Sequence, residues 1–182
     1  MVVATVIVLA SVAAADWYVR NVELRRLMTA AEAAAEAIDQ WETGRDRIMS
    51  DLPGAFYLTP EQRRDTERQV RREAMDATLS LTGAAARVQD VRVTLQWHGA
   101  VVRAQDRYLD HTDAWITRLQ EVARDPSTLS ESTPDIAATR SASEDAFRNA
   151  LPPAALFGLD DRVEALFDGA TAATGTALPI LT

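Results

Sequence analysis

The feature that most constrains the fold is an apolar opening that runs directly into a seven-residue repeat. Residues 2–15 carry no charged side chain, and Gly44 is the only glycine or proline between there and Leu52. Apolar residues then recur at intervals of three and four, which keeps one stripe of a helix facing a neighbour. The stripe comprises Trp17, Leu24, Leu27, Ala31, Ala34, Ile38, Trp41, Ile48 and Leu52. The first part of the chain is therefore predicted to form a long amphipathic helix.

Residues 1–15 are predicted to be a membrane anchor or a signal-type segment. Their apolar part would extend about 21 Å as a helix, whereas a full bilayer span takes about 20 residues. As an anchor, the segment would place Trp17 and Tyr18 at the membrane interface, where aromatic residues collect. As a signal peptide, it offers small residues for cleavage at 13–15 but lacks a basic start. A buried helix is the third alternative, and we expect the single-pass anchor.

The orientation of such an anchor depends on the basic residues around it. Arg20, Arg25 and Arg26 follow the apolar segment and none precedes it, so the positive-inside rule applied to this sequence places the body in the cytoplasm. Basic residues upstream of Met1 would reverse that result. Of the two orientations, we expect a body outside the cytoplasm, attached to the cell membrane.

Composition narrows the fold and the partners. Only four Phe, four Trp and three Tyr are present although 47% of residues are hydrophobic, so closely packed, Ala-rich helices fit better than a thick globular core. The net charge of −8 argues against nucleic-acid binding, which needs a basic stripe. The chain contains no Cys, which excludes disulfides, thiolate metal sites and cysteine nucleophiles.

A second helix is predicted to begin at Pro60, because Thr59 is a good N-cap and Gln62 can complete a capping box. The apolar repeat then continues without a proline until Pro126, which alone would predict one helix of about 65 residues. An antiparallel partner of an anchored first helix would return to the bilayer near residue 97, and continuing straight would carry charged residues into lipid. We therefore predict a break near Trp97.

The local sequence supports that break, because Val91, Val93 and Thr94 are β-branched and disfavour helix. Gly83 is the second candidate position. The predicted helices cover residues 16–52, 60–92, 96–124 and 134–150, with a short helix over 160–167. A polar turn is expected at 125–133 and a flexible tail at 169–182. The predicted fold is all-α: an elongated antiparallel up-down bundle of three to four long helices, residues 16–168, on an N-terminal membrane helix.

The residues that most resemble a binding site are aromatic or histidine. They are Trp97, His98, Tyr108, His111 and Trp115. One interpretation is a small pocket within the bundle in which Tyr108 and His111 bind a ligand; the other is a packed core whose polar tips satisfy one another. His98 and His111 lie about 220° apart around an unbroken helix, so no metal site is predicted.

No catalytic motif, phosphate-binding loop or cofactor fingerprint occurs in the sequence. We therefore expect a non-enzymatic, membrane-anchored, extracytoplasmic helical-bundle protein of the cell envelope, without a cofactor. Its sustained coiled-coil-like repeat indicates binding to a protein partner or self-association. The alternative is a small-ligand-binding bundle that uses the aromatic and histidine face around Trp97, Tyr108, His111 and Trp115.

Overall fold

The computed structural model describes residues 2–51, 59–94, 98–131 and 134–168, and the side chains of residues 2–9, 51 and 168 lie outside that description. Helices account for the described secondary structure, and those ranges contain no strand. The elements are α1 (Val2–Asp51), α2 (Pro60–Gln89), α3 (Gly99–Arg124), a short 3₁₀ helix η2 (Pro126–Ser130), α4 (Pro134–Ala150) and α5 (Leu159–Asp168). The predicted all-α class is confirmed.

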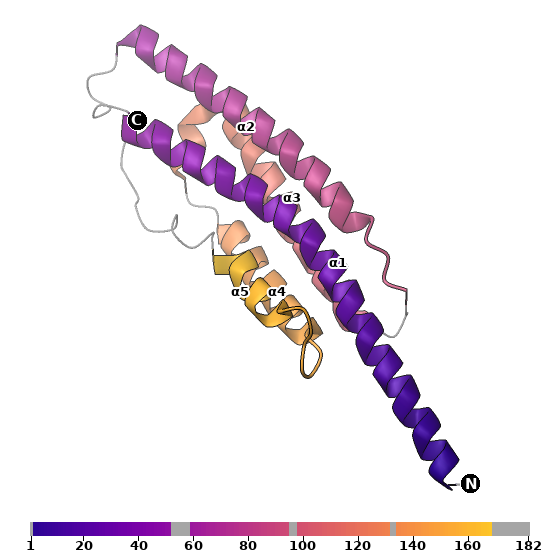
Figure 1. The fold of residues 1–182 in the computed structure, drawn as a ribbon. Coiled ribbons are helices and arrows are strands. Elements are labelled where there is room, and N and C mark those ends of the chain that lie inside the picture. The colour runs from indigo at the N-terminus through magenta and orange to yellow at the C-terminus, as the bar shows by residue number, and fades with distance from the viewer. Residues whose placement is uncertain (1, 52–58, 95–97, 132–133, 169–182) are drawn as a thin grey trace.

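The helices form an elongated antiparallel bundle (Figure 1). Helix α2 runs back along α1, and α3 turns again and packs against α2 and α4. Helices α4 and α5 cover only the half of the bundle nearer the start of α1, where α5 packs on both α1 and α4. The core follows the predicted stripe of α1, with Leu24, Leu27, Ala31, Ala34, Ile38, Trp41 and Ile48 all buried.

The chain leaves helical structure between α2 and α3, as predicted, although the two boundaries differ from the expected ones. Helix α2 ends at Gln89 rather than 92, and α3 begins at Gly99 rather than 96. The described β-branched residues after Asp90 are not helical, consistent with the loss of side-chain freedom that a helix imposes on them. Gly83 lies inside α2, and Trp97 lies outside the described residues.

The break resets the phase of the apolar repeat, which the sequence had suggested was continuous. Val102 is 36% exposed, and Leu109 and Ile116 are only partly buried. The side chains buried on α3 instead include Val101, Ala104, Tyr108, His111 and Trp115. Because a non-helical connection can rotate the next helix about its axis, periodicity across it does not fix which face is inside.

Local signals at the other helix ends are confirmed. The Thr59 hydroxyl accepts from the Gln62 N–H at 3.2 Å, and the Gln62 side chain accepts from the Thr59 N–H at 2.9 Å. The expected polar turn after α3 contains η2, whose start is capped by the Asp125 carboxylate. Helix α4 ends at Ala150, two residues before Pro152.

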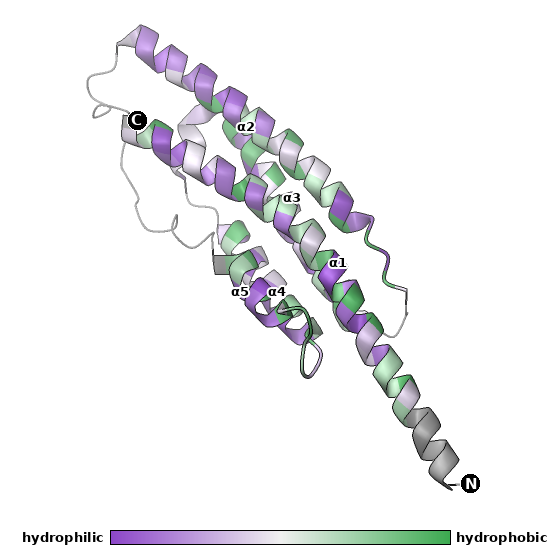
Figure 2. Cartoon of the chain, viewed as in Figure 1, coloured by the Kyte–Doolittle hydropathy of each residue, from purple (hydrophilic) through white to green (hydrophobic). Residues whose placement is uncertain are grey.

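Helix α1 passes from the apolar segment into the bundle without interruption (Figure 1). Its described residues 10–15 are exposed, and 62% of the surface of Val12 is accessible. Figure 2 shows apolar residues here, in contrast to the hydrophilic first turns of α2. Within the part of the chain that the structure describes, no helix is long and apolar enough to cross a membrane. The membrane helix therefore stays a prediction, and the expected tail at 169–182 lies outside the described residues.

Candidate functional site

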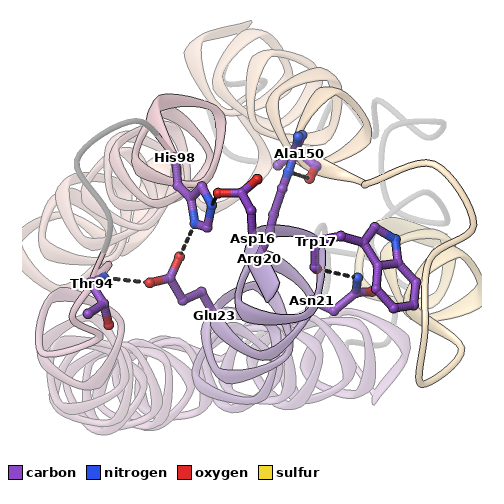
Figure 3. A network of polar contacts seen from close by, with 8 residues as sticks. All are labelled: Asp16, Trp17, Arg20, Asn21, Glu23, Thr94, His98 and Ala150. Carbon is purple, nitrogen blue, oxygen red and sulfur yellow. Dashed lines mark hydrogen bonds and ion pairs between the residues drawn. The ribbon is translucent and has the colours of Figure 1, made fainter. Parts of the chain in front are cut away.

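The N-terminal junction is a site where polar groups gather inside the described part of the bundle. It lies where α1 enters the bundle and consists of Asp16, Trp17, Arg20, Asn21 and Glu23 of α1, together with His98 (Figure 3). It also includes the neighbouring residues 90–94 and 149–158. These α1 residues lie within about two helical turns, and their side chains reach two different connections. Two irregular segments are thereby attached to one rigid helix.

Glu23 and His98 form the buried centre of the junction. Glu23 is 1% and His98 4% exposed. One Glu23 oxygen accepts from the Thr94 N–H at 2.5 Å, and the other lies 2.5 Å from His98 Nδ1. His98 Nε2 lies 3.0 Å from Asp16 Oδ1 (Figure 3). Since carboxylates are acceptors only, both contacts are hydrogen bonds when the ring carries two protons.

Another junction side chain satisfies backbone groups in the last turn of α4. The Arg20 guanidinium donates to the carbonyl oxygens of Asn149 at 3.3 Å and Ala150 at 3.0 Å. These carbonyls belong to the last turn of a helix, which has no intrahelical donors for them and carries partial negative charge. Arg20 therefore caps α4 from a different helix.

Two further α1 side chains hold the connection that follows α4. Trp17 Nε1 donates to the Pro153 carbonyl at 2.9 Å, and Asn21 Oδ1 accepts from the Leu156 N–H at 2.7 Å. Residues 153–156 therefore lie beside α1 at this end of the bundle. The junction binds and orients backbone, and its polar side chains are occupied in doing so.

An aromatic cluster forms the second site, halfway along the bundle. The rings of Tyr108, Phe147 and Phe167 meet edge to face, with centroids 5.7 to 6.3 Å apart. The Tyr108 hydroxyl donates to the Ala31 carbonyl at 2.7 Å. Burial raises the pKa of Tyr108 well above its usual value, so the phenol stays neutral and serves as a donor.

His111 lies beside this cluster, with its ring centroid 6.2 Å from that of Tyr108. His111 Nδ1 lies 3.2 Å from the Thr139 hydroxyl oxygen. Burial, together with the nearby Arg140 guanidinium, lowers the pKa of His111 from 6.5 to about 4. The imidazole is therefore neutral at pH 7.

Tyr108 and His111 line an open cleft of about 380 Å³, here called the mid-bundle cleft. Its volume falls within the range of about 300–1,000 Å³ that small-molecule sites occupy. Three α1 carboxylates, Glu36, Asp39 and Glu42, line one wall, and Arg140 of α4 also lines it. Burial raises the pKa of Glu42, an effect that the nearby guanidiniums of Arg45 and Arg140 oppose. The cleft therefore combines opposite charges with an apolar floor.

The five predicted site residues do not form one site. His98 belongs to the N-terminal junction, whereas Tyr108 and His111 line the mid-bundle cleft. Trp115 is buried, its Nε1 has no hydrogen-bond partner in the described ranges, and it is not among the residues that line the cleft. Trp97 lies outside the described residues. Among the residues that the structure describes, no three His, Asp or Glu side chains are grouped to hold a metal.

Sequence reasoning missed the charged members of both sites. Glu23 could have been suspected, because it lies four residues before Leu27, on the edge of the apolar stripe. Arg140 and Glu42 carry no such signal, since a charged residue in an amphipathic helix is expected on its solvent face. Their proximity depends on how α1 and α4 pack.

Comparison with known proteins adds no family to this description. No family model, no curated protein and no solved structure matches this chain. Its function must therefore be argued from the two sites and from the course of α1.

Proposed function

We propose that this chain is a membrane-anchored helical-bundle protein of the cell envelope that binds a protein partner or a second copy of itself and is not an enzyme. Residues 2–15 would hold α1 in the cell membrane as a single-pass anchor. Residues 16–168 would form a body outside the cytoplasm. Neither nucleic acid nor a cofactor has a part in this proposal.

The course of α1 is the observation that carries the proposal. One helix contains both the apolar segment and the core stripe, and residues 10–15 stay exposed beyond the bundle. A continuous exposed apolar stretch is unfavourable in water and is typical of a segment that another phase or partner covers. Trp17 and Tyr18 follow directly, at the position that suits a membrane interface.

The N-terminal junction would fix the orientation of the body relative to the anchor. Arg20 and Glu23 fasten the segments beside α4 and α3 to the same part of α1 that would leave the bilayer. Because no flexible linker separates α1 residues 10–15 from the bundle, the body would stand at a fixed angle to the membrane. A partner in the envelope would then meet a defined face.

Helix α2 offers the best supported partner face. Met75 is 59% and Leu79 71% exposed, and they lie one helical turn apart. Large exposed apolar side chains grouped on a helix are typical of protein interaction sites. We infer that they contribute to binding of the partner or of the second copy.

Alkaline carbonate extraction of the full chain from bacterial membranes tests the anchor. We expect the protein to stay in the membrane pellet and to be cleaved by protease added from outside. Val8→Asp combined with Val12→Asp should move the protein to the supernatant, because an acid in the bilayer core is costly. Helical circular dichroism of this variant should be unchanged. Release of the unaltered chain by carbonate would overturn the anchor.

Sedimentation of the full chain in detergent, together with capture of envelope proteins, tests the interaction. We expect Met75→Glu with Leu79→Glu to abolish the association, whereas the exposed pair Ser80→Glu with Thr82→Glu on the same helix should leave it intact. A monomer at every concentration that captures no protein would contradict this part of the proposal.

Ligand binding is the second candidate function, and the mid-bundle cleft favours it. Tyr108 and His111, two of the residues that sequence analysis singled out, line a cavity of sufficient size for a small molecule. Trp41 is buried in the same helix as the acidic wall, so tryptophan fluorescence of the chain during titration with small molecules is a direct readout. No fluorescence or heat change with any of them would remove this candidate.

A further inference from the structure

The charges of the mid-bundle cleft are not neutralised by one another. Glu36, Asp39 and Glu42 are spaced three residues apart on α1 and line the cleft together with Arg140. Arg140 makes no hydrogen bond and no ion pair within 4.0 Å in the part of the chain that the structure describes. It is nevertheless near enough to oppose the rise that burial causes in the pKa of Glu42 and to add to the lowering that burial causes in the pKa of His111. A cation and an acidic wall thus line one cavity without pairing.

His111 adds a hydrogen-bond acceptor whose direction can be assigned. The Thr139 hydroxyl donates its single proton to a carbonyl of its own helix, with Asp135 O at 2.8 Å and Ile136 O at 3.1 Å. While it does so it can only accept from His111, and Nδ1 then carries the imidazole proton. Nε2 is left as an unprotonated acceptor, and it has no hydrogen-bond partner among the described residues.

The floor of the cleft is apolar. Ile38, Leu166 and Phe167 line it and are themselves almost fully buried. Their exposed edges can cover a small hydrocarbon group, while the charged groups are at the sides. A ligand for this cleft therefore needs both a charged part and an apolar part.

We propose that the mid-bundle cleft binds a small apolar amino acid as its zwitterion, with the carboxylate on Arg140 and the ammonium on the acidic wall beside His111. The inference rests on the second candidate function, ligand binding at this cleft. An ammonium has three donors, for which Asp39, Glu42 and His111 Nε2 are acceptors. Guanidinium and carboxylate form charge-assisted, bidentate hydrogen bonds.

Ligands with a single charge fit less well. A simple carboxylate would face the three acids of α1, and a simple amine would leave Arg140 unpaired beside a second cation. A metal ion is disfavoured because, in the described ranges, no three His, Asp or Glu side chains are grouped closely enough to hold one. Opposite charges on one small molecule match both sides of the cleft.

Isothermal titration of the full chain with L-leucine tests the inference. We expect saturable binding that weakens at least tenfold for isopentylamine and for 4-methylpentanoate, which each lack one of the two charges. Arg140→Gln and Glu42→Gln should each weaken leucine binding at least tenfold. Arg148→Gln, an exposed arginine of the same helix that pairs with Glu144, is the matched control and should leave it unchanged.

The outcomes separate the ligand class from ligand binding itself. If the amine or the acid binds as tightly as leucine and Arg140→Gln has no effect, the zwitterion is wrong and the cleft is still a ligand site. If none of the three binds at millimolar concentration, the proposed ligand is overturned. NMR titration of His111 checks the geometry independently: Arg140→Gln should raise its pKa, and an unchanged pKa would show that the guanidinium does not face the cleft.

Discussion

The N-terminal junction and the mid-bundle aromatic cluster stabilise the same bundle by different means. At the junction, α1 side chains bond the backbone of two connections, as Glu23 does with Thr94 and Asn21 with Leu156. In the cluster, three rings meet edge to face and the main polar contact is the Tyr108 hydroxyl on a helix carbonyl. The difference follows from the backbone: helix interiors satisfy their own polar groups, and connections near the core do not.

This contrast separates two kinds of specificity. The cluster buries apolar ring surface between α3, α4 and α5. Its contribution to the stability of the fold depends on how completely the ring volumes fill that space. The junction fixes which connection lies against which residue of α1, because an unpaired buried charge would be costly. Four substitutions test that division.

Truncating the cluster should have the largest effect. Phe147 is fully buried and contacts Tyr108 and Phe167, so Phe147→Ala is expected to lower the free energy of unfolding by about 3–5 kcal/mol. Phe157, which is 43% exposed with Arg25 over its ring, is the control, and its change to Ala should cost about 1 kcal/mol or less. Urea denaturation measures both. Equal losses of stability in Phe147→Ala and Phe157→Ala would mean that the aromatic cluster is not the main apolar core of the half of the bundle that α4 and α5 cover.

Breaking the junction should cost nearly as much. Glu23→Ala leaves His98 and the Thr94 N–H without their buried partner, and we expect a loss of about 3 kcal/mol in the free energy of unfolding. Glu32→Ala on the same helix removes an exposed pair with Arg162 and should cost under about 1 kcal/mol. If Glu23→Ala lowered the free energy of unfolding no more than Glu32→Ala does, the buried contacts of Glu23 would not be what holds the connection to α1.

Acid should weaken the middle of the bundle through His111. Its pKa is about 4 when folded against 6.5 as the reference value, so the unfolded state binds more protons between these values and stability falls as the pH drops. From pH 7 to pH 5 this contributes a loss of about 2 kcal/mol. The raised pKa of Glu42 acts in the opposite direction. His111→Gln should flatten the difference in stability between pH 7 and pH 5, and an unchanged slope would contradict the assignment.

Removing the phenol oxygen should have the smallest effect. Tyr108→Phe deletes the hydrogen bond to Ala31 but keeps the ring contacts, so a loss of about 1 kcal/mol is expected. Tyr18→Phe, where the side chain is 54% exposed, should change stability by less than about 0.5 kcal/mol. Thermal unfolding of the pair gives the comparison. A loss as large as that of Phe147→Ala would mean that the cluster depends on its polar contact.

Much of the fold could be predicted because it depends on local sequence. The buried stripe of α1, the capping box at Thr59 and the break before Gly99 each follow from residues within a few positions of one another. The phase of α3 could not be predicted, since a non-helical connection of several residues leaves the rotation of the next helix free. Tyr108 and His111 share one face because both lie within α3, whereas His98 precedes that helix and contacts Glu23 instead.

By itself the sequence determined where helices form and which stripes are apolar, because helix propensity, capping and periodicity act over one or two turns. The tertiary structure alone decided which charges meet. Glu23 and His98 are 75 positions apart, and Arg140 and Glu42 lie on different helices of one cleft. Such encounters depend on the rotation and offset of whole helices, which the summed packing of many side chains selects.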